Sequence, residues 1–355
     1  MRAKRKNHLK AALIIAGGRG TRFWPASRGA RPKPLFALEG KNTLIADTIA
    51  RHQPLIPRER IFVLVPAEQR DAFANELEGV IPAENLLVEP QARGTTVAIV
   101  YGWAVIRERL GDVMLAVTPA DHYVTPGSGF RRTLAQAFNL AGRRRAIVVI
   151  GVTPTRPDSG YGYMKIGPDA GVGFKVERFV EKPAPASARS MVRSGKYLWN
   201  AGMFVMSAET VASELAEHCP RLWKIMGKSE GGAAVNLARA YAKLKLDAFD
   251  REVIEKSAHI FGVRARFRWH DVGSWHGLWE ALRDTGGNAL IGNVMALESE
   301  GVLARAGERL IVLLGVEDLV VVDDADALLV ARRSRSQDVR RVIEELERRR
   351  LHRYL

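Results

Sequence analysis

The stretch LIIAGGRGTRFWPASRGARPKPLF, from Leu13 to Phe36, joins an apolar run to a glycine cluster and then to a series of basic residues. The apolar run is typical of a buried strand. The glycines after it leave backbone N–H groups open to a close ligand, because no Cβ stands in the way. A strand that ends in glycines and positive charge indicates a site for phosphate groups.

Two widespread glycine patterns do not match this segment. The dinucleotide pattern GxGxxG would need glycine in place of Phe23, and the P-loop pattern would need it in place of Arg22. What remains is GGxGTR, followed by Lys33 between two prolines. Arg22 offers a planar fork for phosphate oxygens and Lys33 a point charge, although a turn followed by a solvated basic loop is the plain alternative.

The first 150 residues alternate short apolar runs with amphipathic stretches. Strands are expected at ALIIAGG, RIFVLVP, NLLVEP, VMLAVTPAD and RAIVVIGV, with helical patterns between them. Strands joined by helices of this length predict an α/β domain with a mostly parallel sheet. Ligands of such sheets bind at the carboxyl ends of the strands, where both the glycine cluster and the PADH segment (119–122) fall.

The pattern of apolar and polar residues changes twice after this point. From about residue 160 to 257 the pattern is irregular and indicates a second half of the same domain. After about residue 286, short strands follow one another with no helix between them, and a charged amphipathic helix closes the chain with Val342, Ile343 and Leu346 on its apolar side. We therefore expect one α/β domain at 1–285 and a small β-rich domain, ending in a helix, at 286–355.

Composition narrows the classes of function. The chain has 355 residues, a net charge of +15 and one cysteine, Cys219, which excludes an internal disulfide and a cysteine metal cluster. No apolar run is long enough for a membrane span, and a cytoplasmic location fits best. Much of the positive charge lies at the two ends, and no nucleic-acid motif accompanies it. We expect acidic small-molecule substrates and neither nucleic acid nor membrane as partners.

The GGxGTR…PKP string closely resembles the signature of the sugar-1-phosphate nucleotidylyltransferases. Its continuation WPASR (24–28) is similar to the mannose-1-phosphate guanylyltransferase branch, and the resemblance recurs in matching order from about Leu13 to about Leu346. It implies a Rossmann-like nucleotidyltransferase domain of the GT-A type. It also implies a small C-terminal domain resembling a left-handed β-helix.

Two acidic motifs carry the expected metal site. TPADHYV places Asp121 after an apolar strand, where a helix N-cap is the plain alternative, and RWHDVGSW contains Asp271. The resemblance implies that these two aspartates hold the catalytic Mg²⁺. Because Mg²⁺ prefers oxygen ligands, we expect the adjacent His122 and His270 to be structural.

Three further motifs are expected to contact the sugar phosphate. VERFVEKP contains Glu181 and Lys182, for which a surface salt bridge is the plain reading; YLWNAGMF contains Asn200 and DSGYGYMKIG contains Gly162. The resemblance implies that Glu181 contacts the sugar hydroxyls and Lys182 the sugar phosphate. Asn200 suits a hydroxyl contact, and the open backbone of Gly162 could lie against the hexose.

The nucleotide side of the site follows the signature, with two departures from the family pattern. The residues expected to bind the nucleotide are Gly17, Gly18, Gly20, Thr21 and Arg93. The family usually has Asn where this chain has Gly94, and the guanylyltransferases commonly have Gln where it has Pro34. The PKP form looks more like the glucose-1-phosphate thymidylyl- or uridylyltransferases.

The resemblance implies transfer of GMP from GTP to α-D-mannose 1-phosphate, with diphosphate as the leaving group. Arg22 and Lys33 would neutralise the leaving diphosphate, and Lys182 would position the sugar phosphate for in-line attack. The nucleophile is already anionic, so no general base is needed. A thymidylyl- or uridylyltransferase acting on glucose 1-phosphate, and a non-catalytic sugar-nucleotide-binding regulator, are the alternatives. We also expect a single-activity enzyme, with a homodimer left open.

Overall fold

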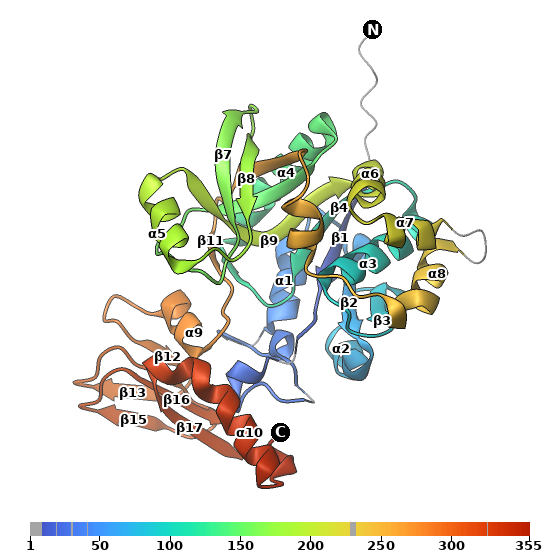
Figure 1. The fold of residues 1–355 in the computed structure, drawn as a ribbon. Helices are drawn as coiled ribbons and strands as arrows, with labels where there is room; N and C mark the ends of the chain where they lie inside the picture. Colours follow the sequence, from blue (N-terminus) through green and yellow to red (C-terminus); the bar gives the residue numbers. More distant parts are fainter. Residues whose placement is uncertain (1–8, 19, 30, 41, 228–231, 325) are drawn as a thin grey trace. The chain divides into compact units, whose positions relative to one another are not determined.

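The computed structural model describes residues 9–18, 20–29, 31–40, 42–227, 232–324 and 326–355, and the basic residues at 2–6 lie outside them. The chain divides into two compact units. The first takes in the described part of Met1–Ala16 together with Ile49–Pro119 and Val124–Arg268. The second consists of Gly17–Thr48, Ala120–Tyr123 and Trp269–Leu355. Each unit therefore combines segments that are distant in sequence (Figure 1).

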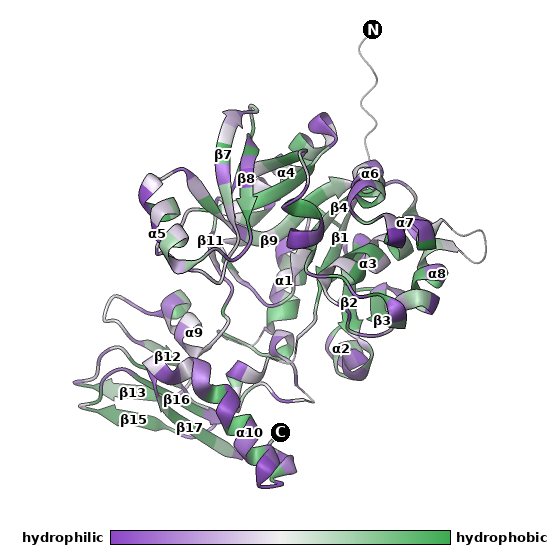
Figure 2. Ribbon diagram, in the orientation of Figure 1, coloured by the Kyte–Doolittle hydropathy of each residue, from purple (hydrophilic) through white to green (hydrophobic). Residues whose placement is uncertain are grey.

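A nine-stranded sheet in the order β3-β2-β1-β4-β9-β6-β10-β8-β7 forms the centre of the first unit. Its strands are β1 (Lys10–Ile15), β2 (Ile61–Pro66), β3 (Leu86–Glu89), β4 (Met114–Pro119), β6 (Ile147–Val152), β7 (Tyr163–Asp169), β8 (Phe174–Val180), β9 (Tyr197–Ser207) and β10 (Ile260–Arg264). The five strands predicted in the first 150 residues are β1, β2, β3, β4 and β6. Figure 2 shows these strands as predominantly hydrophobic, as expected for strands buried on both faces.

The sheet is more mixed than the sequence predicted. Strands β3, β2, β1 and β4 are parallel, as are β6 and β10, but β9 runs antiparallel to β4, β6 and β7, and β8 runs antiparallel to β7 and β10. The antiparallel strands come from the segment whose pattern is irregular. There, β7 and β8 are joined by a short turn, which permits only antiparallel pairing.

Helices cover both faces of this sheet. They are α2 (Arg70–Glu76), α3 (Thr95–Leu110), α4 (Gly127–Arg144), α5 (Pro185–Ser194), α6 (Ala208–His218), α7 (Pro220–Met226) and α8 (Gly232–Ala240), while α1 (Leu44–His52) runs from the second unit into the first. Helices α3, α6, α7 and α8 share one apolar cluster with the sheet. Helix α4 packs on β4, β6, β9 and β10 and shares no residue with that cluster, so it covers the opposite face.

The second unit contains the short strands of the C-terminal region. They are β12 (Ala289–Ile291), β13 (Val294–Leu297), β14 (Leu303–Arg305), β15 (Ile311–Leu314), β16 (Leu319–Asp324) and β17 (Ala327–Arg332), followed by α10 (Arg340–Arg348). Strands β12, β14 and β16 pair in parallel, and so do β13 and β15, so successive strands stack as the coils of a β-helix do. Val302, Ala304, Leu313 and Val321 fill the space between these coils.

The signature segment, residues 17–36, contributes side chains to the core of this second unit. Phe23, Trp24 and Phe36 pack in one cluster with Trp275 of α9 (Trp275–Leu282), and the Phe23 and Trp275 rings lie 4.9 Å apart. Residues of β12, β14, β16, β17 and the apolar side of α10 join the same cluster. The aromatic residues of RFWP therefore anchor the glycine-rich loop. The alternative of a solvated basic loop is wrong for the buried part of this segment.

Two short strands, β5 (Tyr123–Thr125) and β11 (Arg268–His270), form a separate pair. Among the described helices, none combines the length and apolar composition that a bilayer crossing demands.

The expected domain boundary at 285/286 stays a prediction.

Candidate functional site

A cavity of about 780 Å³ lies within the second unit and brings together most of the residues predicted for phosphate and metal binding. Seven of them line it: Gly18, Gly20, Thr21, Arg22, Lys33, Asp121 and Asp271. Gly17 is exposed and directly precedes this group. The volume falls within the range of pockets that hold small ligands and cofactors.

Lys33 lies at the centre of this arrangement and is only 6% exposed. Its Nζ donates to Asp121 Oδ2 at 2.8 Å and to the backbone carbonyl oxygen of Asp271 at 2.9 Å. Gly20, with φ at +58°, makes room for it, because a Cβ there would stand 2.7 Å from the Lys33 Cβ. The glycine of GGxGTR and the lysine of PKP are thus parts of one local structure.

The charge state of Asp121 is set by its neighbours. Burial raises the pKa of Asp121, but the Lys33 ammonium, and after it His122, lower that pKa by more, so it lies below its ordinary value. The Asp271 carboxylate opposes them and raises the pKa of Asp121, which places the two carboxylates within electrostatic range of each other. A second positive charge near them would stabilise both as anions.

Both aspartates offer accessible carboxylate oxygens, since their side chains are 32% and 34% exposed. Asp121 is followed by β5, so the helix N-cap alternative is wrong. His122 Nδ1 accepts from Trp269 Nε1 at 3.0 Å, in agreement with a structural role. Within the described residues, no group of three or more His, Cys, Asp or Glu side chains is arranged to hold a metal.

The sequence did not reveal that the C-terminal segment lines the same cavity. Gln337, Arg340, Ile343 and Glu344 complete its wall. Arg22 Nη1 donates to Gln337 Oε1 at 3.2 Å, across 315 residues of sequence. The one available signal was the amphipathic pattern of this helix, which predicts that it packs on something but not where.

The residues predicted to contact the sugar meet in the first unit. The backbone N–H of Asn200 donates to the Gly162 carbonyl at 2.8 Å, and a Cβ on Gly162 would lie 2.5 Å from Glu181 Oε2. Lys182 Nζ lies 3.6 Å from Glu181 Oε1. The sequence motifs did not single out Asp250, which lies in FDREVIEKS (249–257) and joins this cluster. Its Oδ1 accepts from Asn200 Nδ2 at 2.6 Å.

We call Gly162, Glu181, Lys182, Asn200 and Asp250 the sugar-side cluster, after the contacts predicted for most of them. Two acids in it have raised pKa values. Burial, followed by the Asp250 charge, raises the pKa of Glu181 to about 7, although Lys182 partly opposes them. Burial also raises the pKa of Asp250, against the hydrogen bond from Asn200. Near neutral pH, Glu181 can therefore either donate to a ligand oxygen or accept from a hydroxyl.

The raised pKa of Glu181 predicts a pH-dependent stability. Between about pH 4.5 and 7 the folded protein retains a proton that the unfolded chain has lost, so the free energy of unfolding falls as pH rises. The free energy of unfolding of Glu181→Gln, measured relative to that of wild type, should rise by up to roughly 3 kcal/mol between pH 5 and pH 8. Urea unfolding at each pH measures this difference.

Glu177→Gln is the matched control, because Glu177 is an exposed acid on the same strand, β8. It should show no comparable gain. A pH-independent difference between Glu181→Gln and wild type would contradict the assigned shift.

Arg93 belongs to the first unit and does not line the cavity described above. Its Nη2 donates to Gln91 Oε1 at 2.8 Å. The neighbouring departure, Gly94, has φ at +95°, and a Cβ there would approach the Leu246 carbonyl oxygen to 2.9 Å. The asparagine usual in the family would be strained in this backbone, which gives the departure a local physical reason.

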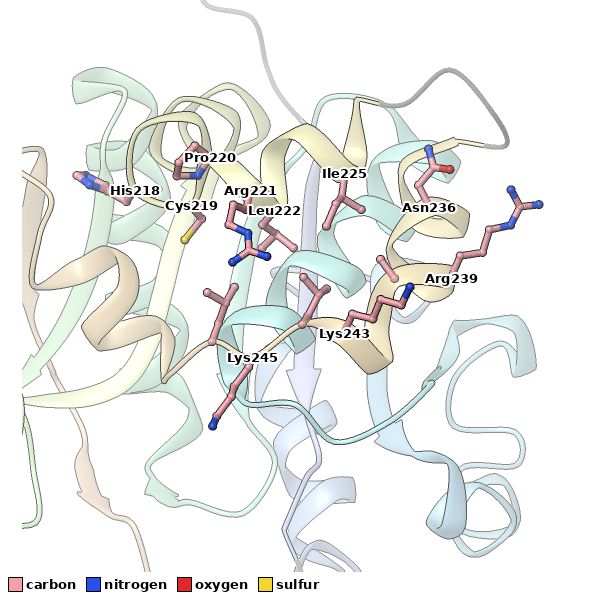
Figure 3. A pocket seen from close by; sticks show the side chains of 13 residues that line it. His218, Cys219, Pro220, Arg221, Leu222, Ile225, Asn236, Arg239, Lys243 and Lys245 are labelled. Atoms are coloured by element: carbon pink, nitrogen blue, oxygen red, sulfur yellow. The ribbon is translucent and has the colours of Figure 1, made fainter.

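A second cavity of about 950 Å³ lies in the first unit, between α6, α7, α8 and the segment that follows them (Figure 3). Leu222, Ile225 and Leu244 contribute apolar surface to it, and Arg221 and Lys243 contribute positive charge. None of the predicted site residues lines it. Apart from Gly17 and Arg93, the residues predicted for catalysis and binding therefore lie in the cavity of the second unit or in the cluster around Glu181 in the first.

Comparison with known proteins agrees with the motifs. Residues 11–287 match the family model described as nucleotidyl transferase, which covers most of the chain. The chain belongs to the nucleotidyl transferase family. Residues 292–346 match the model described as the MannoseP isomerase/GMP-like beta-helix domain. The expected fold class and the expected enzyme class are both confirmed.

Individual relatives show which members of the family this chain is similar to. The xanthan biosynthesis protein XanB of Xanthomonas campestris pv. campestris (strain B100) is 36% identical over 346 residues, covering 94% of this chain and 73% of that protein. The mannose-1-phosphate guanylyltransferase of Escherichia coli is 33% identical, covering 94% of this chain and 73% of that protein. A Thermus thermophilus crystal structure described as mannose-1-phosphate geranyltransferase is 35% identical, with a TM-score of 0.83, covering 95% of this chain and 99% of that chain. The chain is thus a homologue of mannose-1-phosphate guanylyltransferases.

Proposed function

We propose that this chain transfers GMP from GTP to α-D-mannose 1-phosphate and releases diphosphate. The observation that carries the proposal is the contact of buried Lys33 with both Asp121 and Asp271 in the cavity that the GGxGTR loop lines. Relatives named as mannose-1-phosphate guanylyltransferases, at 33% identity over 94% of the chain, support the choice of substrates.

In this proposal the second unit binds the triphosphate. The backbone N–H groups at Gly17, Gly18, Gly20 and Thr21 can donate to phosphate oxygens. The three glycines have no Cβ, so the phosphates can approach the backbone closely. Arg22 and Lys33 neutralise the negative charge that develops on the leaving diphosphate. Because the sugar phosphate is already an anionic nucleophile, these residues need to hold and orient the reactants, and no proton has to be removed.

Asp121 and Asp271 fit a Mg²⁺ site. Carboxylate oxygens are the ligands this ion prefers, and Mg²⁺ commonly takes one or two carboxylates together with substrate phosphates and water. Two accessible carboxylates beside a cavity match that pattern, and among the described residues no third His, Cys, Asp or Glu side chain is grouped with them for metal binding. When bound, the ion would supply charge neutralisation at the phosphate oxygens.

The sugar-side cluster of the first unit would bind mannose 1-phosphate. Glu181 and Asn200 offer hydrogen bonds to hydroxyl groups, Gly162 leaves open backbone, and the exposed ammonium of Lys182 suits the phosphate. Arg93 remains a proposed contact of the nucleotide. A cytoplasmic location also remains part of this proposal.

A homodimer likewise stays a prediction, and one surface of the β-rich region favours it. The cross-strand pairs Met295–Val312 and Leu297–Leu314 of β13 and β15 present four exposed apolar side chains on one face. A contiguous apolar patch of this kind is typical of an interaction surface.

The test of the proposed function is substrate choice. Diphosphate release is measured with Mg²⁺ and each nucleoside triphosphate in turn, using mannose 1-phosphate or glucose 1-phosphate as the acceptor. We expect the highest kcat/KM for GTP with mannose 1-phosphate. Faster turnover of dTTP or UTP with glucose 1-phosphate would favour the alternative that Pro34 and Gly94 suggest. Release with none of the pairs would favour a binding protein.

A further inference from the structure

The wall that the C-terminal segment contributes to the triphosphate cavity contains a cation with no role in the proposal so far. Arg340, the first residue of α10, lines this cavity with Ile343 and Glu344, which lie three and four residues further along the same helix face. Val342 and Leu346 pack against the apolar cluster of the second unit, and Ile343 contacts that cluster as well as the cavity. Packing of α10 thus fixes which of its side chains face the cavity.

The three cations of the cavity differ in what they already contact. Lys33 is occupied by Asp121 and by the Asp271 carbonyl, and Arg22 donates to the neutral amide of Gln337. Arg340 is exposed and forms no ion pair or side-chain hydrogen bond with the residues that the structure describes. A nucleoside triphosphate carries several negative charges, and a guanidinium can hold two phosphate oxygens at once.

From this arrangement we infer that the C-terminal segment completes the triphosphate site. Arg340 binds phosphate oxygens of the nucleotide directly, and Gln337 is a positioning residue that orients the Arg22 guanidinium without neutralising its charge. This inference rests on the proposed function, because it assigns two more residues to the same cavity. It gives the β-rich region a part in substrate binding that neither its strands nor its apolar packing would predict.

The chain offers a matched control for Arg340. Arg341 is the next residue on α10, is also exposed and carries the same charge, but does not line the cavity. Arg340→Gln and Arg341→Gln therefore remove the same charge from the protein, but only Arg340→Gln removes a charge from the cavity wall. Glu344, the acid on the same wall, opposes a bound phosphate, so Glu344→Gln should bind nucleotide at least as tightly as wild type.

The experiment is calorimetric titration of the full chain with GTP and Mg²⁺ in the absence of any sugar phosphate, so that binding is read without turnover. We expect Arg340→Gln to weaken the Kd about tenfold, the scale of one lost charge-assisted contact, and Arg341→Gln to leave it within about twofold. An unchanged Kd for Arg340→Gln, or equal losses in both variants, would overturn the inference. Failure of the wild type to bind any nucleoside triphosphate would instead overturn the proposed function itself.

Gln337 is tested through its partner. If it acts by orienting Arg22, then Gln337→Ala should weaken GTP binding in the wild-type background and have no further effect in an Arg22→Gln background. Additive losses in the double variant would show that Gln337 does not act through Arg22.

Discussion

Asp271→Asn should fold normally and lose nearly all turnover of GTP with mannose 1-phosphate. The substitution keeps the backbone carbonyl that Lys33 contacts, so the local structure is preserved, but it removes a carboxylate from the proposed Mg²⁺ site. Loss of a metal ligand of this kind removes several kcal/mol of transition-state stabilisation, or roughly a thousandfold in kcat. Steady-state kinetics at saturating substrates and millimolar Mg²⁺ measure the effect.

Asp121→Asn should lose turnover to a similar extent, with an additional cost in stability because its Oδ2 is the partner of the buried Lys33 ammonium. Asp71→Asn is the control, since Asp71 is an exposed acid on α2. Its kinetics and thermal unfolding should match those of wild type. Near-normal activity in Asp121→Asn or Asp271→Asn at millimolar Mg²⁺ would refute the metal role of that residue.

Lys33→Met should produce the second-largest loss. Lys33 is a buried cation that donates to the Asp121 carboxylate and to the Asp271 backbone carbonyl, and it is proposed to neutralise the leaving diphosphate. Removing one preorganised electrostatic contact of this type costs roughly a hundred- to a thousandfold in kcat. The Lys33→Met protein should also unfold at a lower temperature, because Asp121 is left without its ion-pair partner.

Arg31→Gln provides the comparison for Lys33. Arg31 lies two residues earlier, its side chain is 48% exposed, and its nearest carboxylate partner, Asp324, is 4.0 Å away. The substitution removes the same charge from the same loop, yet it should leave kcat within about twofold, as expected for an exposed charge. A Lys33→Met enzyme that is also within twofold of wild type would remove Lys33 from the proposed mechanism.

The parts of the fold and site that the sequence predicted are those with a local signal. The run Leu13–Ile15 before the glycines marks a buried strand, and its parallel neighbour β4 ends just before Asp121. Because parallel strands end at the same edge of a sheet, the expectation that the glycine loop and Asp121 share a site needed no long-range information. The short C-terminal strands were visible from the sequence pattern, but their stacking as a β-helix was implied only by the family resemblance.

The parts that could not be predicted depend on distant contacts. The hydrogen bond between Arg22 and Gln337, and the position of Arg340 on the cavity wall, arise from packing of α10 on the aromatic residues of the signature segment. A helical pattern identifies an apolar face but not the surface that covers it. Asp250 was missed for the same reason, since its partner Asn200 lies 50 residues away in sequence.

The most direct test of the central claim is the fate of GTP with and without mannose 1-phosphate. Purified protein, GTP and Mg²⁺ are incubated in both conditions, and diphosphate and GDP-mannose are followed together by phosphorus NMR. We expect no diphosphate without the sugar phosphate, and equal amounts of diphosphate and GDP-mannose when it is present. Diphosphate released from GTP alone, or no GDP-mannose in the complete mixture, would contradict direct transfer of GMP to mannose 1-phosphate.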